Sequence, residues 1–572
     1  MEYLISTIKI NNALKIGKYW IVGDCIARNT DGFSLEEGKI FEEHNDTKFG
    51  YFNWISYKEK SDELIIKNDK RGQLALYYYY DGNDFIVSNN LWKILSNVGD
   101  SKIEFLIDKI KEYICFYRIP DGESTIFKNI KTFKPGVDVI FRNNKLNIKE
   151  YWDYKFENRS LELNDAVDEL DCAIKNFFSR LSPNKIYGFG NSGGLDSRLI
   201  AIYLSEFGYS NIGFIIGSKK PNGFLLSQSH NNAAKLSKLF GFKNYFIEFD
   251  YTADWELRNL LDIRNNPIGS SNILKNTYTH PIFREFDSLL VGHPGTAVGA
   301  VAPKFENKSP DQIVETLFFF YSKRRSNINN TSFDYLTRIK KFLRMDKGDH
   351  YVKMSTQEKL IDNNVLTRLV GIEDLKSKND FKDFYLKNND KSLLNIWSRH
   401  INNIMAQFTY NGAFESMNRT VDAYYLYYPY AFEKIISWPP EFLYDRKALK
   451  RLIIKKSKHA AKINDQSGES VREDNISRYE HPMDYFLGKL ESRMRGSGLE
   501  FNRWIKNSDL VAYFDKTFSV KNPVFDDIFK SKLIYQVYSY PIIIELLKLK
   551  RIMDIVYYKQ YNILERKDWI IK

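Results

Sequence analysis

Cysteine is scarce in this sequence, and its scarcity excludes several classes of protein. The 572 residues include three cysteines, Cys25, Cys115 and Cys172. Their spacing matches neither a metal site nor a disulfide framework. We therefore exclude a disulfide-stapled secreted protein and expect a chain that works in a reducing cytoplasm.

Long apolar runs and a secretory signal are also missing. The most apolar stretch near the C-terminus, residues 542–552, is interrupted by two lysines, an arginine and a glutamate. Such a segment cannot span a bilayer, because its charges would have to enter the hydrocarbon. We expect a cytoplasmic protein with no membrane-spanning helix.

Positive charge exceeds negative charge, with 84 lysines and arginines against 72 aspartates and glutamates, a net charge of +12. Such an excess can indicate a nucleic-acid partner. The lysines are spread along the whole chain, however, and the densest basic run, residues 447–458, carries Leu449, Leu452 and Ile453 at helical spacing. We interpret this run as a solvated helix face and expect no nucleic-acid partner.

Residues 187–198 are the most informative stretch of the chain. They read Tyr-Gly-Phe-Gly-Asn-Ser-Gly-Gly-Leu-Asp-Ser-Arg. A short apolar strand leads into them, and apolar residues at helical spacing follow up to Gly208. A strand that turns through two glycines into a helix exposes backbone N–H groups at the positive end of that helix. The stretch therefore predicts an anion site.

The side chains of this turn suit a phosphate ligand. Gly193 and Gly194 allow the backbone to approach a phosphate closely. Ser192 and Ser197 add hydroxyl donors, and Asp196 can hold a divalent cation. An ordinary glycine-rich turn without a ligand stays open as the alternative.

A dinucleotide-binding fingerprint is a second way to interpret Gly188, Gly190 and Gly193. That motif needs an acidic residue at the end of the next strand, roughly 20 residues on. Here the strand predicted at residues 212–216 runs into Gly-Ser-Lys-Lys. The dinucleotide interpretation therefore fails.

The two halves of the chain differ in their pattern of predicted elements. The first 150 residues predict a layered α+β domain, with strands at residues 3–8, 19–22, 63–66, 74–80, 85–87 and 137–141, a hairpin turn at 81–83 and a helix at 103–116. The second half alternates strands at residues 212–216 and 245–249 with a helix at 232–240. That alternation predicts a parallel sheet with helices on both faces.

Several segments resemble one known family. Residues 192–197 resemble the pyrophosphate-binding loop of the ATP-pyrophosphatase superfamily. Residues 69–72 and 85–88 resemble the glutaminase-type domain of class II amidotransferases, and residues 124–127 and 134–136 resemble the connector into the synthetase domain of asparagine synthetase. The chain is thus similar to the asparagine synthetase family over nearly its whole length.

The resemblance implies a fold that combines α/β and α+β parts. Residues 1–155 would form a degenerate class II glutamine amidotransferase-like domain of the layered Ntn-hydrolase type. Residues 160–572 would form an asparagine synthase-like domain, a doubly wound parallel sheet of the ATP-pyrophosphatase (adenine nucleotide alpha hydrolase-like) type with a helical C-terminal extension.

The implied function is an ATP-dependent amide-forming ligase. It would adenylate a small-molecule or peptide carboxylate, release pyrophosphate, and transfer the acyl group to an amine or ammonia, with ATP and Mg²⁺ as cofactors. A homodimer is compatible with this function. The alternative is a catalytically degenerate nucleotide-binding or scaffold protein.

The resemblance also implies which residues contact ATP. Asp196 would in addition hold Mg²⁺, and Ile216 is equally well explained as a core residue. The aromatic run at residues 424–430 would line either the core or the acceptor substrate. The implied nucleotide contacts are Asn191, Ser192, Gly193, Gly194, Asp196, Ser197, Ile216, Gly217 and Gly292.

Two residues are implied to be catalytic. Lys447 matches the lysine of the family's Lys-x-x-Leu-Arg helix start, with Lys450 as the spare, and would stabilise the acyl-adenylate and the tetrahedral intermediate. His293 stands where the family has a Glu or a Tyr and would be a general base. A surface lysine and a structural histidine are the alternatives.

Thr296 replaces the second metal-binding Asp, which lowers the expected metal affinity. Arg198 would add positive charge beside the phosphates.

Glutamine hydrolysis is expected to be absent. Class II amidotransferases use an N-terminal cysteine as nucleophile, whereas here Met1 is followed by Glu2, and a carboxylate cannot replace a thiolate in attacking an amide. The N-terminal domain would then be a structural or docking module, as in the similar β-lactam synthetases. We expect the purified protein to release no glutamate from glutamine above a buffer control in a coupled assay. Glutamate release above that control would contradict this expectation.

Overall fold

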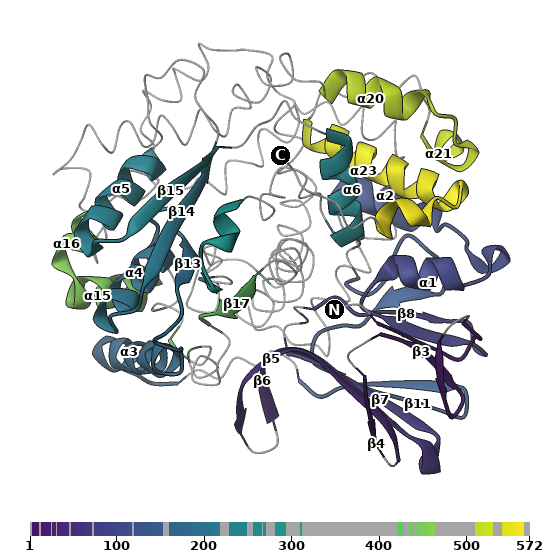
Figure 1. The fold of residues 1–572 in the computed structure, drawn as a ribbon, viewed down its shortest axis with the longest axis horizontal. Helices are drawn as coiled ribbons and strands as arrows, with labels where there is room; N and C mark the ends of the chain where they lie inside the picture. The colour runs from purple at the N-terminus through teal and green to yellow at the C-terminus, as the bar shows by residue number, and fades with distance from the viewer. Residues whose placement is uncertain are drawn as a thin grey trace.

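Figure 1 shows the fold in a computed structural model, with three β-sheets and the helices around them drawn as ribbons. Two of the sheets are antiparallel and come from the first 150 residues, and the third is parallel and comes from later in the chain. The structure describes residues 3–10, 13–23, 26–29, 31–44, 47–70, 72, 74–116, 119, 121–152, 159–217, 228–248, 255–265, 267–269, 281–292, 309, 311, 421–427, 435, 438–439, 442, 446–463, 510–529 and 540–565.

The two antiparallel sheets pack face to face. The first has the strand order β10-β8-β9-β1-β3-β2, and the second has the order β12-β11-β7-β6-β5-β4. Alternate residues of their strands are buried in a shared core that includes Tyr19, Phe33 and Ile66. The bounds of these strands are β1 Leu4–Ser6, β2 Leu14–Ile16, β3 Tyr19–Val22, β4 Ile26–Asn29, β5 Gly32–His44, β6 Thr47–Lys58, β7 Glu63–Asn68, β8 Tyr77–Tyr80, β9 Phe85–Ser88, β10 Ile130–Thr132, β11 Val137–Arg142 and β12 Lys145–Glu150.

A strand is found at each segment predicted in the first 150 residues, although β1 and β8 are shorter than the predictions at residues 3–8 and 74–80. The segment at residues 19–22 is β3, and the segments at 85–87 and 137–141 differ from β9 and β11 by one residue at the C-terminal end. These strands were predictable because apolar and polar residues alternate along them with the two-residue period of a half-buried strand. In β7, for example, every second residue is buried.

Helices from distant parts of the chain cover the outer face of the first sheet. Trp92 donates from Nε1 to the carbonyl of Ile263 at 3.0 Å, and the Tyr113 hydroxyl donates to Glu545 at 2.7 Å. These contacts join the N-terminal layers to the second half of the chain in one hydrophobic core. The helices are α1 Leu91–Asn97, α2 Ile107–Phe116, α6 Trp255–Asn265, α20 Leu510–Ser519, α21 Pro523–Ile528 and α23 Tyr540–Tyr557.

Three of the four charges that interrupt the apolar C-terminal stretch, Glu545, Lys548 and Lys550, are buried within α23. Lys548 pairs with Asp262 of α6 at 3.2 Å, and Lys550 pairs with Asp554 at 2.6 Å. None of the helices that the structure describes is long and apolar enough to cross a membrane.

The third sheet is parallel, as predicted, with the order β15-β14-β13-β16-β17. The chain runs outward from β13 to β15 and then returns to the other side of β13 as β16, so the strand order reverses beside β13. Open α/β sheets bind ligands at such a reversal, beyond the carboxyl ends of the strands. The strands are β13 Tyr187–Gly190, β14 Asn211–Gly217, β15 Lys243–Glu248, β16 Ser288–Val291 and β17 Asp422–Tyr425.

The prediction of helices on both faces of this sheet is met on one face only, among the described residues. Five helices share a core with Tyr187, Phe189 and Leu290 on that face, and Figure 1 shows α3, α4 and α5 beside the sheet on the left. α6, which follows β15 in the chain, packs with the N-terminal layers instead. The five helices are α3 Leu163–Ser179, α4 Leu195–Glu206, α5 Gln228–Phe240, α15 Lys447–Lys456 and α16 Lys458–Lys462.

The opposite face of the parallel sheet meets the N-terminal part of the chain. The hydroxyl of Tyr51, on β6, donates to the carbonyl of Ala423 on β17 at 2.9 Å. The Tyr51 ring also packs edge-on against Tyr425, with 4.9 Å between ring centroids. The core on this face further includes Phe283 of the 3₁₀ helix η3 (Pro281–Arg284). β17 is therefore held by both halves of the chain.

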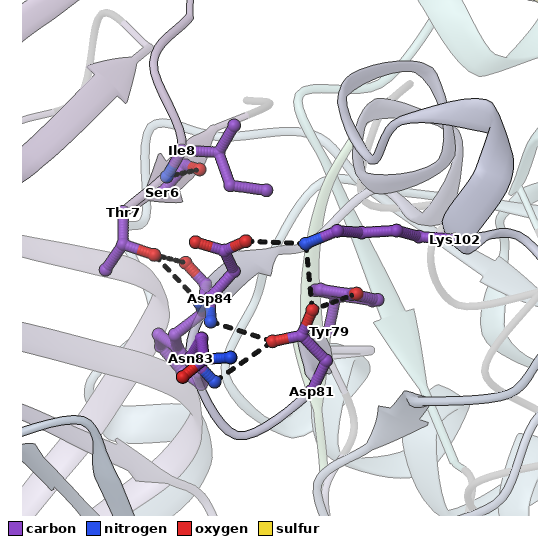
Figure 2. A network of polar contacts seen from close by, with 9 residues as sticks. Ser6, Thr7, Ile8, Tyr79, Asp81, Asn83, Asp84 and Lys102 are labelled. Atoms are coloured by element: carbon purple, nitrogen blue, oxygen red, sulfur yellow. Dashed lines mark hydrogen bonds and ion pairs between the residues drawn. The ribbon is translucent and has the colours of Figure 1, made fainter.

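The predicted hairpin turn between β8 and β9 is confirmed and is closed by the Asp81 carboxylate (Figure 2). Oδ1 of Asp81 accepts from the backbone N–H groups of Asn83 and Asp84 at 3.0 and 2.8 Å. Oδ2 accepts from the Tyr79 hydroxyl at 2.7 Å and from Lys102 at 2.9 Å. Burial would raise the pKa of Asp81, but these donors together lower it well below its usual value.

This network predicts a pH-dependent contribution to stability. Because the pKa of Asp81 is lower in the folded protein, its stabilisation is present above the unfolded pKa of about 3.9 and is lost as the pH falls below it. We expect Asp81→Asn to cost about 1–2 kcal/mol at pH 7 and progressively less toward pH 3, measured by urea unfolding. Glu104→Gln, at an exposed ion pair with Lys128, is the control and should change little. A deficit that does not depend on pH would contradict this role for the Asp81 charge.

Candidate functional site

The loop between β13 and α4 is shaped by Gly193. Its φ angle is +68°, in the region that favours glycine. A Cβ at this position would lie 2.6 Å from the Cβ of Asn232 on α5, closer than real carbon atoms approach. Glycine is therefore required here both by the backbone angle and by the close packing of the loop against α5.

Gly194 places the start of α4 at the loop. It is the N-cap residue, it has extended backbone angles, and it has no side chain to cap the first N–H groups of the helix. The Gly194 N–H donates to Oγ of Ser192 at 3.3 Å, and the Ser197 hydroxyl donates back to the Gly194 carbonyl at 3.0 Å. The first turn of α4 thus presents backbone donors at its positive end, where an anion is stabilised.

Arg198 holds the loop in place through hydrogen bonds to the backbone. Its side chain is fully buried, and it donates from Nε to the carbonyl of Gly193 at 2.8 Å and from Nη1 to the carbonyl of Ala460 at 3.2 Å. The positive charge of Arg198 therefore lies next to the loop backbone, and its predicted effect on bound phosphates stays a prediction. A buried guanidinium is stable only where it is satisfied by acceptors, and here those acceptors are carbonyls that tie the loop to α16.

Asp196, in the first turn of α4, is held by two residues far away in the chain. Its Oδ1 accepts from the Tyr427 hydroxyl at 2.7 Å and from Nη2 of Arg446. Its Oδ2 accepts from Nη1 of Arg446 at 3.2 Å. Tyr427 follows β17, and Arg446 is the N-cap residue of α15, with a left-handed φ of 56°. The N-termini of α4 and α15 therefore meet at this carboxylate.

The protonation states of the two partners follow from their surroundings. Burial, and then the adjacent Asp196 carboxylate, raise the pKa of Tyr427 well above its usual value, so the phenol keeps its proton. Burial alone would lower the pKa of Arg446, but the charge of Asp196 outweighs it and raises that pKa. The site therefore holds a guanidinium cation and a neutral phenol against one carboxylate.

A Mg²⁺ ion does not fit Asp196 in this arrangement. Mg²⁺ requires oxygen ligands in octahedral geometry, usually including one or two carboxylates. Both oxygens of Asp196 already accept from Arg446, and that cation would repel a metal ion. Within the part of the chain that the structure describes, no group of three His, Cys, Asp or Glu side chains could hold a metal.

Most of the other predicted nucleotide contacts lie at the same edge of the parallel sheet. Gly292 follows β16, and a Cβ there would come within 2.7 Å of the Asp196 Cβ. Ile216 and Gly217 end β14, beyond its pairing with β13. Asn191 is completely buried, with its amide donating to the Ala233 carbonyl at 3.0 Å. Its side chain therefore anchors the loop and is not exposed to a ligand.

Of the two predicted catalytic residues, Lys447 lies within the described part of the chain and His293 does not. Lys447 begins α15 directly after Arg446 and is half-buried, and no hydrogen bond or ion pair of its side chain is found among the described residues. Lys450 lies one turn further along the same helix. His293 and Thr296 lie outside the described residues, just after Gly292. Lys447 and His293 stay predictions.

Arg446 and Tyr427 were missed as site residues from the sequence. A signal for Arg446 existed, because Arg446, Leu449 and Lys450 have the Lys-x-x-Leu-Arg spacing with the two basic residues exchanged. Requiring lysine at the first position moved the motif by one residue, to Lys447. Tyr427 lay within an aromatic run that gave no reason to single it out.

Comparison with known proteins supports an asparagine synthase-like family for this chain. Residues 39–152 match the glutamine amidotransferase domain family. A Methanocaldococcus jannaschii protein named glutamine-hydrolyzing asparagine synthetase 2 is 29% identical over 166 residues, 28% of this chain and 31% of that protein. Glutamine-hydrolyzing asparagine synthetase 3 of Bacillus subtilis is 26% identical over 153 residues, 26% of this chain and 25% of that protein. The matches span less than a third of either relative.

Two solved structures are similar to parts of the chain. Glutamine phosphoribosylpyrophosphate amidotransferase from B. subtilis, complexed with ADP and GMP, is 12% identical, with a TM-score of 0.17, over 40% of this chain and 63% of that one. The U34-tRNA thiolase NcsA from Methanococcus maripaludis is 13% identical, with a TM-score of 0.20, over 47% of this chain and 90% of that one. Scores this low do not establish a shared architecture.

The packing of the loop predicts a specific cost for Gly193→Ala. Gly208 is the matched control, because its φ is also +68° but a Cβ there would meet nothing within 4 Å. Gly208→Ala should cost about 1–2 kcal/mol from its backbone angle alone. Gly193→Ala should cost about 1–3 kcal/mol more, because the loop must also move away from α5. Urea unfolding of the two variants measures the difference, and equal costs would mean that the loop tolerates the added methyl group.

Proposed function

We propose that this chain, which has an asparagine synthase-like sequence, is an ATP-dependent ligase that forms an amide from a carboxylate and an amine. The observation that carries this proposal is the glycine loop at the start of α4, where Arg446 and the N-terminus of α15 converge. The loop follows the strand at which the order of the parallel sheet reverses. Such a position suits a nucleotide whose phosphates meet the helix end.

The electrostatics of the loop favour a polyphosphate. Two helix N-termini contribute partial positive charge, and Arg446 and Lys447 stand at one of them. Cations at the positive end of a helix are unfavourable by about 0.3–1 kcal/mol each unless an anion compensates them. Asp196 supplies one negative charge, which is less than the combined positive charge of Arg446, Lys447 and the two helix N-termini. A bound triphosphate or pyrophosphate would balance the remainder.

The proposed reaction has two steps. A substrate carboxylate oxygen attacks the α-phosphorus of ATP, the bond to the β-phosphate oxygen breaks, and pyrophosphate leaves. An amine then attacks the acyl carbon, loses a proton, and displaces AMP. The N–H groups of α4 and the Arg446 guanidinium would hold the departing pyrophosphate, and Lys447 would stabilise the oxyanion of the second step. His293, which follows Gly292, would accept the proton of the amine.

The nitrogen source in this proposal is ammonia or a separate amine. Residues 39–152 match the glutamine amidotransferase domain family, but the proposal includes no glutaminase step. The N-terminal sheets would then serve to support β17 through Tyr51.

A second candidate is a nucleotide-binding or scaffold protein without turnover. One observation favours it, namely that both oxygens of Asp196 are already engaged by Arg446. The two candidates differ in whether labelled pyrophosphate exchanges into ATP when candidate carboxylates are supplied. Exchange requires a reversible adenylation, which a scaffold protein lacks.

Lys447→Met tests the assignment of the second step. We expect this variant to form amide about a hundredfold more slowly, on the scale of losing one oxyanion donor, while pyrophosphate exchange falls much less. Lys455→Met is the matched control, because Lys455 lies on the same helix in an exposed pair with Asp168. If Lys447→Met and Lys455→Met both form amide at the unmodified rate, Lys447 is a surface residue.

A further inference from the structure

We infer that Arg446 takes the place of a divalent cation at Asp196, so that the loop binds pyrophosphate and the phosphates of ATP without Mg²⁺. This inference rests on the proposed function, which requires that a nucleotide binds here. It concerns the positive charge that balances the phosphates. The guanidinium of Arg446, which is part of the polypeptide, supplies that charge.

The contact geometry leaves little room for a metal at Asp196. Arg446 donates to both carboxylate oxygens, and the Tyr427 hydroxyl donates to one of them. The side chains are largely withdrawn from water, with 15% of Arg446 and 24% of Asp196 exposed. A Mg²⁺ ion bound to either oxygen would lie close to the guanidinium. Two cations so close together repel strongly where water is largely excluded.

The other groups around the carboxylate do not favour a metal either. The Tyr427 hydroxyl donates its hydrogen to Oδ1 of Asp196 at 2.7 Å. A phenol that donates its hydrogen to a carboxylate is a poor ligand for Mg²⁺, which prefers charged oxygens and water. Among the described residues, Asp196 belongs to no group of three His, Cys, Asp or Glu side chains that could hold a metal ion.

The position of Arg446 is fixed by the fold around it. It has a left-handed backbone, with a φ of 56°, which is unfavourable for a residue other than glycine. Directly after it, Ala448, Leu449 and Leu452 anchor α15 in the core shared with α3 and α4. The packing of α15 therefore holds the guanidinium at the start of α4.

The guanidinium also retains a donor for a ligand. Nε of Arg446 is buried and has no hydrogen-bond partner among the described residues. A buried donor without an acceptor is unfavourable, because it has lost its hydrogen bonds to water. Phosphate oxygens match the planar fork of a guanidinium, which makes two parallel hydrogen bonds to them. The ligand class that satisfies this donor is a di- or triphosphate.

Binding of inorganic pyrophosphate and of ATP, measured by calorimetry in EDTA and again in excess Mg²⁺, tests this inference on the unmodified protein. We expect both ligands to bind in EDTA with an affinity that Mg²⁺ does not improve. If either binds only with Mg²⁺, the inference is wrong while the proposed function stands. If neither binds under any condition, the proposed function fails and the inference with it.

Two variants separate the role of Arg446 from that of the fold. Arg446→Met should weaken pyrophosphate binding in EDTA by about tenfold or more, because a charge-assisted pair is lost. Arg446→Met should also create Mn²⁺ binding, detected by electron paramagnetic resonance, because Asp196 is released. Arg446→Met combined with Asp196→Asn should lose this Mn²⁺ binding, and Lys455→Met should match the unmodified protein. Tight Mn²⁺ binding at Asp196 in the unmodified protein would overturn the inference, even if Arg446→Met does not fold.

Discussion

The ion pair between Asp196 and Arg446 is the contact on which the candidate site depends. It joins the first turn of α4 to the N-cap of α15, across 250 residues of sequence. Without Arg446, the Asp196 carboxylate at the loop would lose the guanidinium that pairs with it. Without Asp196, the guanidinium would be buried among helix N-termini of the same sign, which is costly in a low-dielectric surrounding. Each residue therefore compensates the charge of the other. Together they determine the charge that a ligand encounters at the loop.

Asp196 is also connected to the N-terminal sheets, through Tyr427 and β17. Tyr51 on β6 contacts both Ala423 and Tyr425 of β17, and Tyr427, two residues beyond the strand, donates to Asp196. A displacement of β17 would move that hydroxyl relative to the carboxylate. The N-terminal sheets thus have a structural use that needs no glutaminase chemistry, because they pack against the strand that positions a site residue.

The two halves of the chain also share a core away from the site. α6 and α23 complete the helical layer over the first antiparallel sheet and carry buried charges, including the Lys548–Asp262 pair. Removing one partner of a buried pair leaves an unpaired charge, with a cost of about 3–5 kcal/mol. The N-terminal sheets therefore depend on C-terminal helices for both apolar cover and charge balance.

Local features of the fold followed from the sequence alone. The strands at residues 19–22 and 85–87, the turn closed by Asp81, and the glycine loop before α4 are recognisable from patterns that span only a few residues. Side-chain alternation and glycine backbone freedom report directly on such contacts. The pairing of Asp196 with Arg446 and Tyr427 was decided only by the tertiary structure, as was the packing of α6 against the N-terminal layer. Those contacts join segments separated by well over a hundred residues, and no local pattern records which distant side chain will meet a given carboxylate.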